Sequence, residues 1–421
     1  MPQQKCWFGA MKVMVLAMVL VLFSGLAAAR EYKVLYRFSG IKDGDLPGNL
    51  VFDAAGNIYG TTLDGGRGKF IGTVFKLTPN SDGTWTKSTL YAFCALKNCV
   101  DGFNPDQALI FDKAGNLYGA TSGGGAFQWG TVFKLSPNTN GPWRETVLYS
   151  FKGGADGAFP NGVIFDAAGN LYGTTFEGGG SANQGTAFKL TANSDGTWTH
   201  SVLYNFCSLS GCSDGLGPSE VILDQAGNLY GAAGGGLISC YNGGCGVIFK
   251  LAPNSGGSWT ESVLHTFTGG TDGAFPGGVI FDSAGNLYGT TGSGGNLNCS
   301  RQGFKGCGLV FKLVPNANGS WTENVLRSFA NDPMASPLGL LFDSSGNLYG
   351  SGAGGPANAG SLFKMTPNGD GRWALTVLHV FLGKPGYGPS VPVENAGHFY
   401  GSTGLCGNEK KCGGVIFELT P

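Results

Sequence analysis

The residues with the clearest capacity for chemistry are ten of the eleven cysteines, which fall into five close pairs. The pairs are Cys94 with Cys99, Cys207 with Cys212, Cys240 with Cys245, Cys299 with Cys307, and Cys406 with Cys412. Local pairing and an even count favour disulfides, which persist in oxidising compartments. Metal binding is the competing interpretation, but no pair has the Cys-x-x-Cys spacing of common zinc sites. We therefore predict five disulfides that pin short loops.

A second group of residues could bind a ligand because these residues lie in Gly-rich stretches of variable length. The predicted ligand-binding residues are Trp129, Phe176, Glu177, Tyr241, Arg301 and Lys305, and Phe70 lies in an equivalent stretch. Aromatic side chains in ordered loops suit stacking against sugar rings or peptide side chains. The alternative is that these residues belong to a variable surface that binds no ligand. The sequence assigns these stretches no catalytic residue, no metal ligand and no cofactor.

Five copies of Asp-Gly-x-x-Pro raise the question of Ca²⁺ binding, since several carboxylates around one centre could collect that ion. The copies begin at Asp43, Asp101, Asp156, Asp214 and Asp272. A structural role explains the motif better. Asp can accept hydrogen bonds from its own turn, Gly allows the bend, and Pro begins a strand where no donor is needed.

An enzyme usually needs a singular constellation of residues that breaks the repeat. The four histidines, His200, His265, His379 and His398, are separated and take the places of other residues in recurring segments. We predict surface or packing roles for them. The sequence has no Ser-centred elbow, phosphate loop or His-rich metal motif. A polysaccharide or lactone enzyme built from Glu177, Arg301 and Lys305 stays open as an alternative.

The strands that position these residues are predicted from tandem sequence repeats. One motif, Gly-Asn-(Leu/Ile)-Tyr-Gly, begins at Gly56, Gly115, Gly169, Gly227, Gly285 and Gly346. A degenerate seventh copy, "GHFYG", begins at Gly397. A segment such as "TVFKL" also occurs seven times, whereas a Trp followed by Val-Leu-x-x-Phe occurs only six times. The missing seventh ending is "EYKVLYRF", from Glu31 to Phe38, at the other end of the chain. Such a period must be interpreted before anything else, because it decides the fold.

Each repeat predicts four antiparallel strands. In residues 160–206, "GVIF" and "NLYGTT" flank a tight Asp-x-x-Gly turn, and "GTAFKL" and "TWTHSVLYNF" follow. The turns that precede each Trp, such as "SDGTW", are similar to sialidase Asp-boxes. The spacing of their residues is shorter than in an Asp-box, which favours a turn followed by a Trp that packs in the core. A linear β-solenoid would need capping units. We predict instead an all-β fold, a seven-bladed β-propeller of four-stranded antiparallel blades, closed by the N-terminal strand completing the last blade. The expected blades are residues 39–93, 94–151, 152–206, 207–267, 268–329, 330–381, and 382–421 plus 30–38.

The segments "GTVFKLTPN" and "FDAAGNLYGTT", with the Gly-rich spacer between them, resemble the GloVer tandem repeat family of exported bacterial proteins. The resemblance covers nearly all of residues 30–421 and implies an extracytoplasmic location, but the family has no established activity. The chain lacks the C-terminal sorting tail of many relatives. "FDxxGNLYG" is also similar to NHL-type propellers, which include binding modules and enzymes, so fold alone does not decide the function.

Residues 1–29 are predicted to be a signal peptide, with Lys5 and Lys12 before an apolar run and Ala27 to Ala29 at the cleavage site. A membrane anchor is the alternative, although the run is short for a span. Cleavage reduces the 26 basic residues to 24 against 27 acidic ones, a balance that does not attract nucleic acid. We predict an extracellular or periplasmic monomer without a membrane span. Its predicted function is non-catalytic binding of a carbohydrate polymer, such as a cell-wall glycan, or of an envelope protein.

Overall fold

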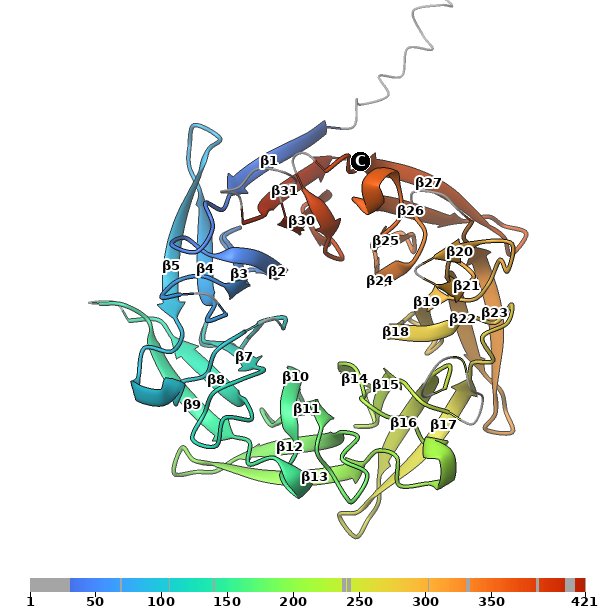
Figure 1. The fold of residues 1–421 in the computed structure, drawn as a ribbon, viewed down its shortest axis with the longest axis horizontal. Helices are drawn as coiled ribbons and strands as arrows, with labels where there is room; N and C mark the ends of the chain where they lie inside the picture. Colours follow the sequence, from blue (N-terminus) through green and yellow to red (C-terminus); the bar gives the residue numbers. More distant parts are fainter. Residues whose placement is uncertain are drawn as a thin grey trace, which may run out of the picture.

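The chain forms a ring of seven antiparallel sheets around a central axis (Figure 1). This arrangement, seen in a computed structural model, confirms the predicted all-β, seven-bladed propeller. The predicted signal peptide, residues 1–29, lies outside the described residues. The structure describes residues 31–68, 70–105, 107–138, 141–236, 240, 244–301, 303–330, 334–383, 386–405 and 413–420.

Four strands build each of blades 1 to 6, and the first strand of each blade lies nearest the axis (Figure 1). Blade 1 is β2 (Asp45–Phe52), β3 (Ile58–Asp64), β4 (Thr73–Pro79) and β5 (Trp85–Ala92); blade 2 is β6 (Ile110–Phe111), β7 (Leu117–Thr121), β8 (Thr131–Ser136) and β9 (Arg144–Ser150). Blade 3 is β10 (Ala158–Phe165), β11 (Leu171–Glu177), β12 (Thr186–Ala192) and β13 (Trp198–Asn205); blade 4 is β14 (Val221–Leu223), β15 (Leu229–Ala233), β16 (Val247–Pro253) and β17 (Trp259–Thr266).

Blades 5 and 6 follow the same order, except that blade 5 carries an extra two-stranded ribbon. Blade 5 is β18 (Ala274–Phe281), β19 (Leu287–Ser293), β22 (Leu309–Pro315) and β23 (Trp321–Ser328), and its ribbon is β20 (Ser300–Arg301) with β21 (Phe304–Lys305). Blade 6 is β24 (Pro337–Phe342), β25 (Leu348–Gly352), β26 (Ser361–Pro367) and β27 (Trp373–Val380). The helical structure of the described residues consists of four single 3₁₀ turns: η1 (Lys97–Cys99), η2 (Gly154–Asp156), η3 (Ser210–Cys212) and η4 (Pro356–Asn358).

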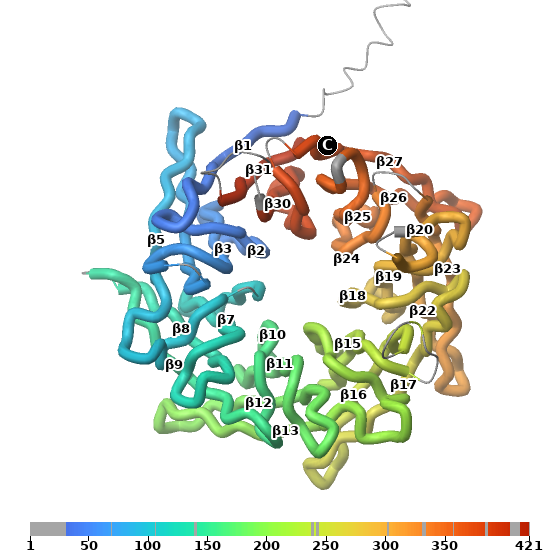
Figure 2. Tube along the Cα trace, viewed as in Figure 1, coloured from blue at the N-terminus to red at the C-terminus, as the bar shows by residue number. Residues whose placement is uncertain are grey.

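Blade 7 joins the two ends of the described chain, β1 and β31, which lie side by side in Figure 2. Its outer strand is β1 (Glu31–Arg37), which pairs antiparallel with β31 (Val415–Thr420), from Glu31 opposite Thr420 to Arg37 opposite Val415. The inner strands are β30 (His398–Leu405), β29 (Val393–Asn395) and β28 (Tyr387–Pro389). The predicted closure by the N-terminal strand is therefore confirmed, and it removes the open edge that β31 would otherwise present.

The core consists of seven similar seams between neighbouring blades. At each seam the Phe that ends the outer strand of one blade packs against the Phe of the "FKL" segment of the next blade. The ring centroids of these pairs are 4.8–5.6 Å apart: Phe38–Phe75, Phe93–Phe133, Phe151–Phe188, Phe206–Phe249, Phe267–Phe311, Phe329–Phe363 and Phe381–Phe417. These rings are fully or almost fully buried, so two of the recurring motifs exist to fill the same seam.

The glycine that follows Tyr in each "NLYG" segment is required by this packing. A Cβ built at Gly173 would lie 2.7 Å from Cζ of Phe188, and one at Gly289 would lie 2.5 Å from Cζ of Phe311. Real Cβ atoms do not approach other carbons so closely, so a larger residue would push the Phe ring out of the seam. Glycine at this position allows the aromatic ring to lie directly on the second strand.

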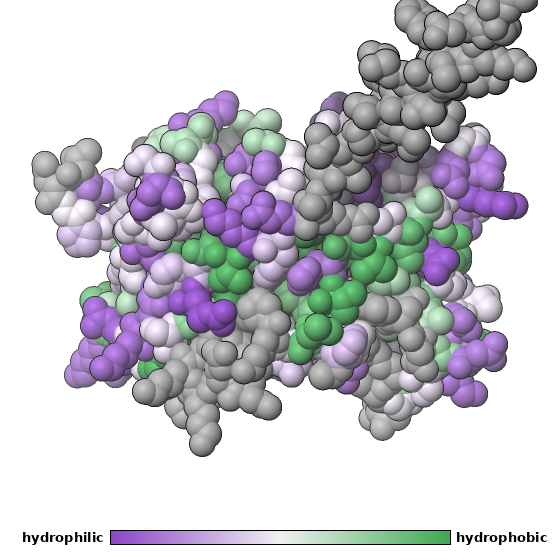
Figure 3. Space-filling view, turned by 90° about the horizontal axis from the view of Figure 1, so that it is seen from above, coloured by the Kyte–Doolittle hydropathy of each residue, from purple (hydrophilic) through white to green (hydrophobic). Residues whose placement is uncertain are grey.

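No helix in the described part of the chain has the length and hydropathy needed to cross a membrane. The rim of the ring is formed by the outer strands, and Figure 3 views it over β1 and β27. On this side of the rim, hydrophobic residues form patches along the middle, and hydrophilic residues gather toward the edges.

Candidate functional site

The ring has two faces with different loops. The turn face carries the hairpin turns within each blade, between its first and second strands and between its third and fourth strands. The variable-loop face carries the connections between second and third strands and between the outer strand of one blade and the inner strand of the next. This division follows from four strands that alternate in direction.

Four disulfides lie on the variable-loop face. They join Cys94 to Cys99, Cys207 to Cys212, Cys240 to Cys245, and Cys299 to Cys307, as predicted. The predicted fifth pair, Cys406 with Cys412, lies outside the described residues. Each bridge closes a loop of only five to eight residues, so it fixes the local shape of the loop more than it stabilises the ring.

The aspartate of Asp-Gly-x-x-Pro organises the same loops. Asp101 is fully buried, and its carboxylate accepts hydrogen bonds from the Tyr91 hydroxyl at 2.8 Å and from the backbone N–H groups of Ala95 and Leu96 at 2.7 and 3.2 Å. Asp214 has the equivalent bonds from Tyr204, Ser208 and Leu209. These contacts support the predicted structural role of the motif. Among the described residues, no group of three His, Cys, Asp or Glu side chains could hold a metal ion.

Trp129 is the most exposed tryptophan of the predicted site, with 40 % of its surface accessible. Its ring packs edge-on against Phe159 of blade 3, with centroids 5.4 Å apart, and its backbone carbonyl accepts the Phe159 N–H at 3.0 Å. A Cβ at Gly153 would lie 2.8 Å from the indole Nε1. The indole is therefore held between two blades while one part of it faces solvent.

The other predicted residues lie at separate places on the same face. Phe176, 56 % exposed, and Glu177 end the strand β11, and the Phe176 ring lies beside Gly217 of the next seam. Lys305 is exposed in the ribbon of blade 5, opposite Ser300. Arg301 lies in the same ribbon, but its side chain is outside the described residues, as is the whole of Tyr241. The structure brings Trp129, Phe176 and Glu177 to neighbouring seams and places Lys305 on blade 5.

Sequence reasoning missed several exposed residues of this face. Phe127 is 50 % exposed, two residues before Trp129, and the ammonium of Lys152 lies 6.0 Å from its ring centroid. Leu96 and Leu209 are each 54 % exposed in the two equivalent disulfide loops. The available signal was an apolar residue inside a short Cys-closed loop, a position that cannot contribute to a core.

His200 and His379 have packing roles, one of the two kinds of role predicted for the histidines. His200 stacks on Tyr149 with centroids 4.3 Å apart, and His379 stacks on Tyr32 at 4.1 Å. Nδ1 of His200 also lies 3.3 Å from the Asp156 carboxylate of the preceding loop. Burial lowers the pKa of both His200 and His379, so both are neutral at pH 7.

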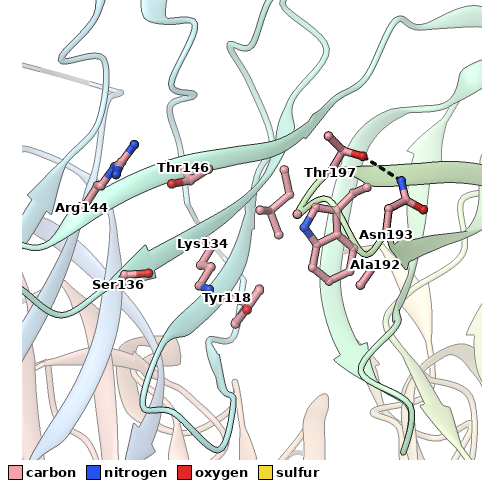
Figure 4. Close-up of a pocket in the computed structure, with 11 residues that line it drawn as sticks. Tyr118, Lys134, Ser136, Arg144, Thr146, Ala192, Asn193 and Thr197 are labelled. Carbon is pink, nitrogen blue, oxygen red and sulfur yellow. Dashed lines mark hydrogen bonds between the residues drawn. The ribbon is translucent and has the colours of Figure 1, made fainter.

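An open groove on the turn face, between blades 2 and 3, is a second place where polar side chains converge (Figure 4). Its volume is about 440 Å³. One wall carries Tyr118, Lys134, Ser136, Arg144 and Thr146, and Ala192, Asn193 and Thr197 lie on the facing wall. Nδ2 of Asn193 donates to the Thr197 hydroxyl at 2.9 Å.

The residues of the repeat now identify the family. The model of the Gloeobacter/Verrucomicrobia repeat matches residues 21–162 and 144–303. The chain belongs to this family. The match confirms the resemblance to the GloVer repeat proteins, and each of its two segments extends over more than two blades.

Solved structures resemble this member of the Gloeobacter/Verrucomicrobia repeat family in fold. The extracellular domain of a candidate hybrid two-component system from B. thetaiotaomicron is 14 % identical with a TM-score of 0.51, over 93 % of this chain and 42 % of that one. The chain thus spans less than half the length of that domain, and the likeness concerns the propeller fold alone. A candidate gluconolactonase is 14 % identical with a TM-score of 0.40, over 93 % of this chain and 92 % of that one. No curated protein matches this chain.

Proposed function

We propose that this protein is an exported recognition module that binds carbohydrate polymers through its variable-loop face, without turning them over. The observation that carries the proposal is the uneven distribution of exposed apolar side chains between the two faces. Soluble monomers rarely expose apolar side chains in groups unless these contact a partner. A one-sided distribution therefore marks the side on which recognition takes place.

Among the described residues, ten of the fourteen large hydrophobic side chains that are strongly exposed belong to the variable-loop face, and the turn face has none. The other four lie on the outer strands (Val202, Val263 and Val325) or on an inner strand (Leu338). The ten are Ile41, Phe70, Leu96, Val100, Phe127, Trp129, Phe176, Leu209, Leu297 and Leu382.

Aromatic rings at fixed positions favour a carbohydrate over other partners. Phe127, Trp129 and Phe176 present ring surfaces at different places along blades 2 and 3, as a polymer with repeated sugar rings requires. The packing of Trp129 on Phe159 limits the motion of the indole, so little entropy is lost on binding. An envelope protein is the second partner class, and the test below includes it as an outcome.

Four disulfides on one face support export, because such bonds persist in oxidising compartments. An extracellular or periplasmic monomer without a bound cofactor fits this role. The loops of the variable-loop face need no metal for their shape, since Asp101 and Asp214 already use their carboxylates within the loops.

The test is a binding array of glycans, cell-wall polymers and envelope proteins with the chain from residue 30, with and without Ca²⁺, and with product analysis of every hit. The proposal expects binding without released product, and loss of binding in the Phe127→Ala and Trp129→Ala variants. Val202→Ala is the matched control, since Val202 is 37 % exposed but lies on an outer strand. Released product would instead support a polysaccharide or lactone enzyme. Binding only to envelope protein would overturn the carbohydrate assignment.

A further inference from the structure

The wall of the groove on blade 2 gathers two cations on one face of the sheet. Lys134 pairs with Thr146, and Ser136 pairs with Arg144, in the antiparallel register of β8 and β9. Directly paired residues, and residues two apart along a strand, share one sheet face. Tyr118 pairs with Lys134 from β7, and the Lys134 ammonium lies 5.6 Å from the centroid of its ring. Two cations, two hydroxyls and a phenol ring therefore line one wall of the groove. In Figure 4 Lys134 points toward Tyr118, and Arg144 lies at the far end of the same wall and points the other way.

Arg144 breaks the repeat. The corresponding residues in blades 1, 3, 4 and 5 are threonines, and each of their hydroxyls hydrogen-bonds an asparagine of its own turn. Blades 6 and 7 have Ala374 and Glu31 in that register position. A residue that recurs in most blades serves the fold, so the folding of blade 2 gives no reason for an arginine here. The four threonines are Thr86, Thr199, Thr260 and Thr322.

The facing wall is a rigid polar turn of blade 3 that ends in Trp198. Asn193 Nδ2 donates to the hydroxyls of Thr197 and Thr199 at 2.9 and 3.0 Å, and the Thr197 hydroxyl donates to Asp195 at 2.6 Å. Trp198 is half-buried, with its ring centroid 6.5 Å from that of Tyr118. An indole beside fixed amide and hydroxyl groups suits a ring that has both an apolar side and hydroxyl substituents.

The charge of this groove distinguishes it from the similar groove between blades 1 and 2. The lining of the latter, which has a volume of about 570 Å³, includes the carboxylates of Asp53 and Asp112. The lining of the groove between blades 2 and 3 includes no carboxylate. Asp112 lies behind Tyr118 and accepts its hydroxyl at 3.1 Å, and Asp195 is a fully exposed residue of the facing turn.

We propose that this groove is a second binding site, for the carboxylate-bearing sugar residue of an acidic polysaccharide. Arg144 binds the carboxylate, with its guanidinium fork donating two parallel hydrogen bonds. Lys134 recurs in most blades over the ring of a tyrosine, and here it adds positive charge to the same wall. Trp198 contacts the apolar side of the ring, and Ser136, Thr146 and Thr197 meet its hydroxyls. The volume of about 440 Å³ lies within the range of pockets that hold small ligands, about 300–1,000 Å³. The site is independent of the variable-loop face.

The test is isothermal titration of the full chain with oligogalacturonate and with the same oligomer methyl-esterified at its carboxyl groups. We expect binding of the acid form that weakens with salt, and at least tenfold weaker binding of the ester. Arg144→Thr installs the residue of four other blades, so folding should be unaffected. It should weaken the acid form about tenfold to a hundredfold, the loss expected when hydrogen bonds to a charged group are removed. Arg144→Lys keeps the charge but lacks the guanidinium fork. Its affinity for the acid form should lie between those of the wild-type chain and of Arg144→Thr.

Three results would overturn the proposal: equal affinity for acid and ester, unchanged affinity in Arg144→Thr with an unchanged melting temperature, or equally strong competition by inorganic phosphate. Trp129→Ala separates the two sites, because it should leave oligogalacturonate binding at the groove intact. Loss of that binding in Trp129→Ala but not in Arg144→Thr would place the acidic ligand on the variable-loop face and would also contradict the proposal.

Discussion

The two faces of the ring use their hydrogen bonds in different ways. On the turn face, six copies of one Asp-x-x-Gly-Asn turn repeat the same contacts. In the first copy, Asp53 Oδ1 accepts the N–H groups of Ala55 and Asn57 at 2.9 Å, and Gly56 takes a φ of 78°. On the variable-loop face, each loop has its own length, disulfide or buried aspartate, and apolar side chains remain exposed. The comparison teaches that positions which repeat build the ring, and we propose that recognition depends on positions that break the repeat.

The largest effect is expected where the repeat fills a seam. Phe188 is fully buried in blade 3, and Phe176, on the adjacent strand of that blade, is 56 % exposed. Phe188→Ala should reduce the free energy of unfolding by about 3–5 kcal/mol, because it removes buried contacts and leaves a cavity. Phe176→Ala should change it by less than about 1 kcal/mol. Denaturant unfolding of both variants measures the difference. Similar losses of unfolding free energy in the two variants would show that the buried seam and the exposed face do not differ in their contribution to stability.

The second effect concerns pH, because three seams hold pairs of carboxyl groups. The pairs are Glu145 with Asp101, Glu261 with Asp214, and Glu323 with Asp272. Burial, with the nearby aspartate charge, raises the pKa of Glu145 to about 8 and the pKa values of Glu261 and Glu323 to about 7. The buried Oε1 atom of each glutamate has no hydrogen-bond partner. The seams therefore favour the protonated form of each glutamate over its ionised form.

The sign of this pH dependence follows from the raised pKa values. Below about pH 4.5 the glutamates are protonated in both states, and stability from this source is fully present. As the pH rises toward 7 and 8, the unfolded chain ionises first, so the free energy of unfolding falls. One unit of pKa difference corresponds to about 1.4 kcal/mol. We expect a smaller decrease in stability with rising pH in the triple variant Glu145→Gln, Glu261→Gln, Glu323→Gln. Melting temperatures measured between pH 5 and 8 check this.

Three histidines oppose this trend at acid pH and provide its control. Burial lowers the pKa values of His200, His265 and His379, so their contribution is present above about pH 6.5 and is lost as the pH falls. The triple glutamine variant should therefore still lose stability on acidification below pH 6. If the triple glutamine variant and the wild-type chain changed in melting temperature by the same amount between pH 5 and 8, the assignment of protonated glutamates would be contradicted.

A smaller effect is expected on the turn face. Asp166 Oδ1 accepts the N–H groups of Ala168 and Asn170 at 2.9 and 2.8 Å, and Oδ2 accepts the Asn170 amide at 2.7 Å. Burial acts to raise the pKa of Asp166, but these hydrogen bonds outweigh it and hold the pKa below its usual value. Asp166→Ala should cost about 1–2 kcal/mol of stability and leave glycan binding unchanged. Thermal unfolding and the binding array measure the two effects, and a specific loss of binding would assign recognition to the turn face.

The smallest effect on stability is expected at the exposed tip of the variable-loop face. Phe127→Ser should change the free energy of unfolding by no more than about 0.5 kcal/mol, because the ring is half exposed and contacts mainly the Lys152 ammonium. The same variant should lose polymer binding, which an affinity titration at matched protein concentration would detect. A marked loss of stability without a loss of binding would show that Phe127 belongs to the framework.

Periodic features of the sequence were predictable, and contacts between blades were not. The "FKL" and "VLxxF" segments predicted strands, and their count predicted the closure by Glu31–Arg37, because each copy follows local rules of alternation and turn chemistry. The pairing of Glu145 with Asp101 requires the register between outer strands of different blades, which no local pattern contains. The groove at Arg144 was missed for the same reason, since its facing wall is a turn of the next blade. The binding roles of Trp129, Phe176, Glu177, Tyr241, Arg301 and Lys305 stay predictions.

The most direct test of the division between the faces is hydrogen–deuterium exchange of the chain from residue 30, with and without the tightest-binding neutral polymer from the array. The account predicts slower exchange in the loops of the variable-loop face, at residues 94–104, 122–130 and 178–185, and unchanged exchange in the Asp-x-x-Gly-Asn turns. Protection of those turns, with none in the loops around Trp129, would contradict it.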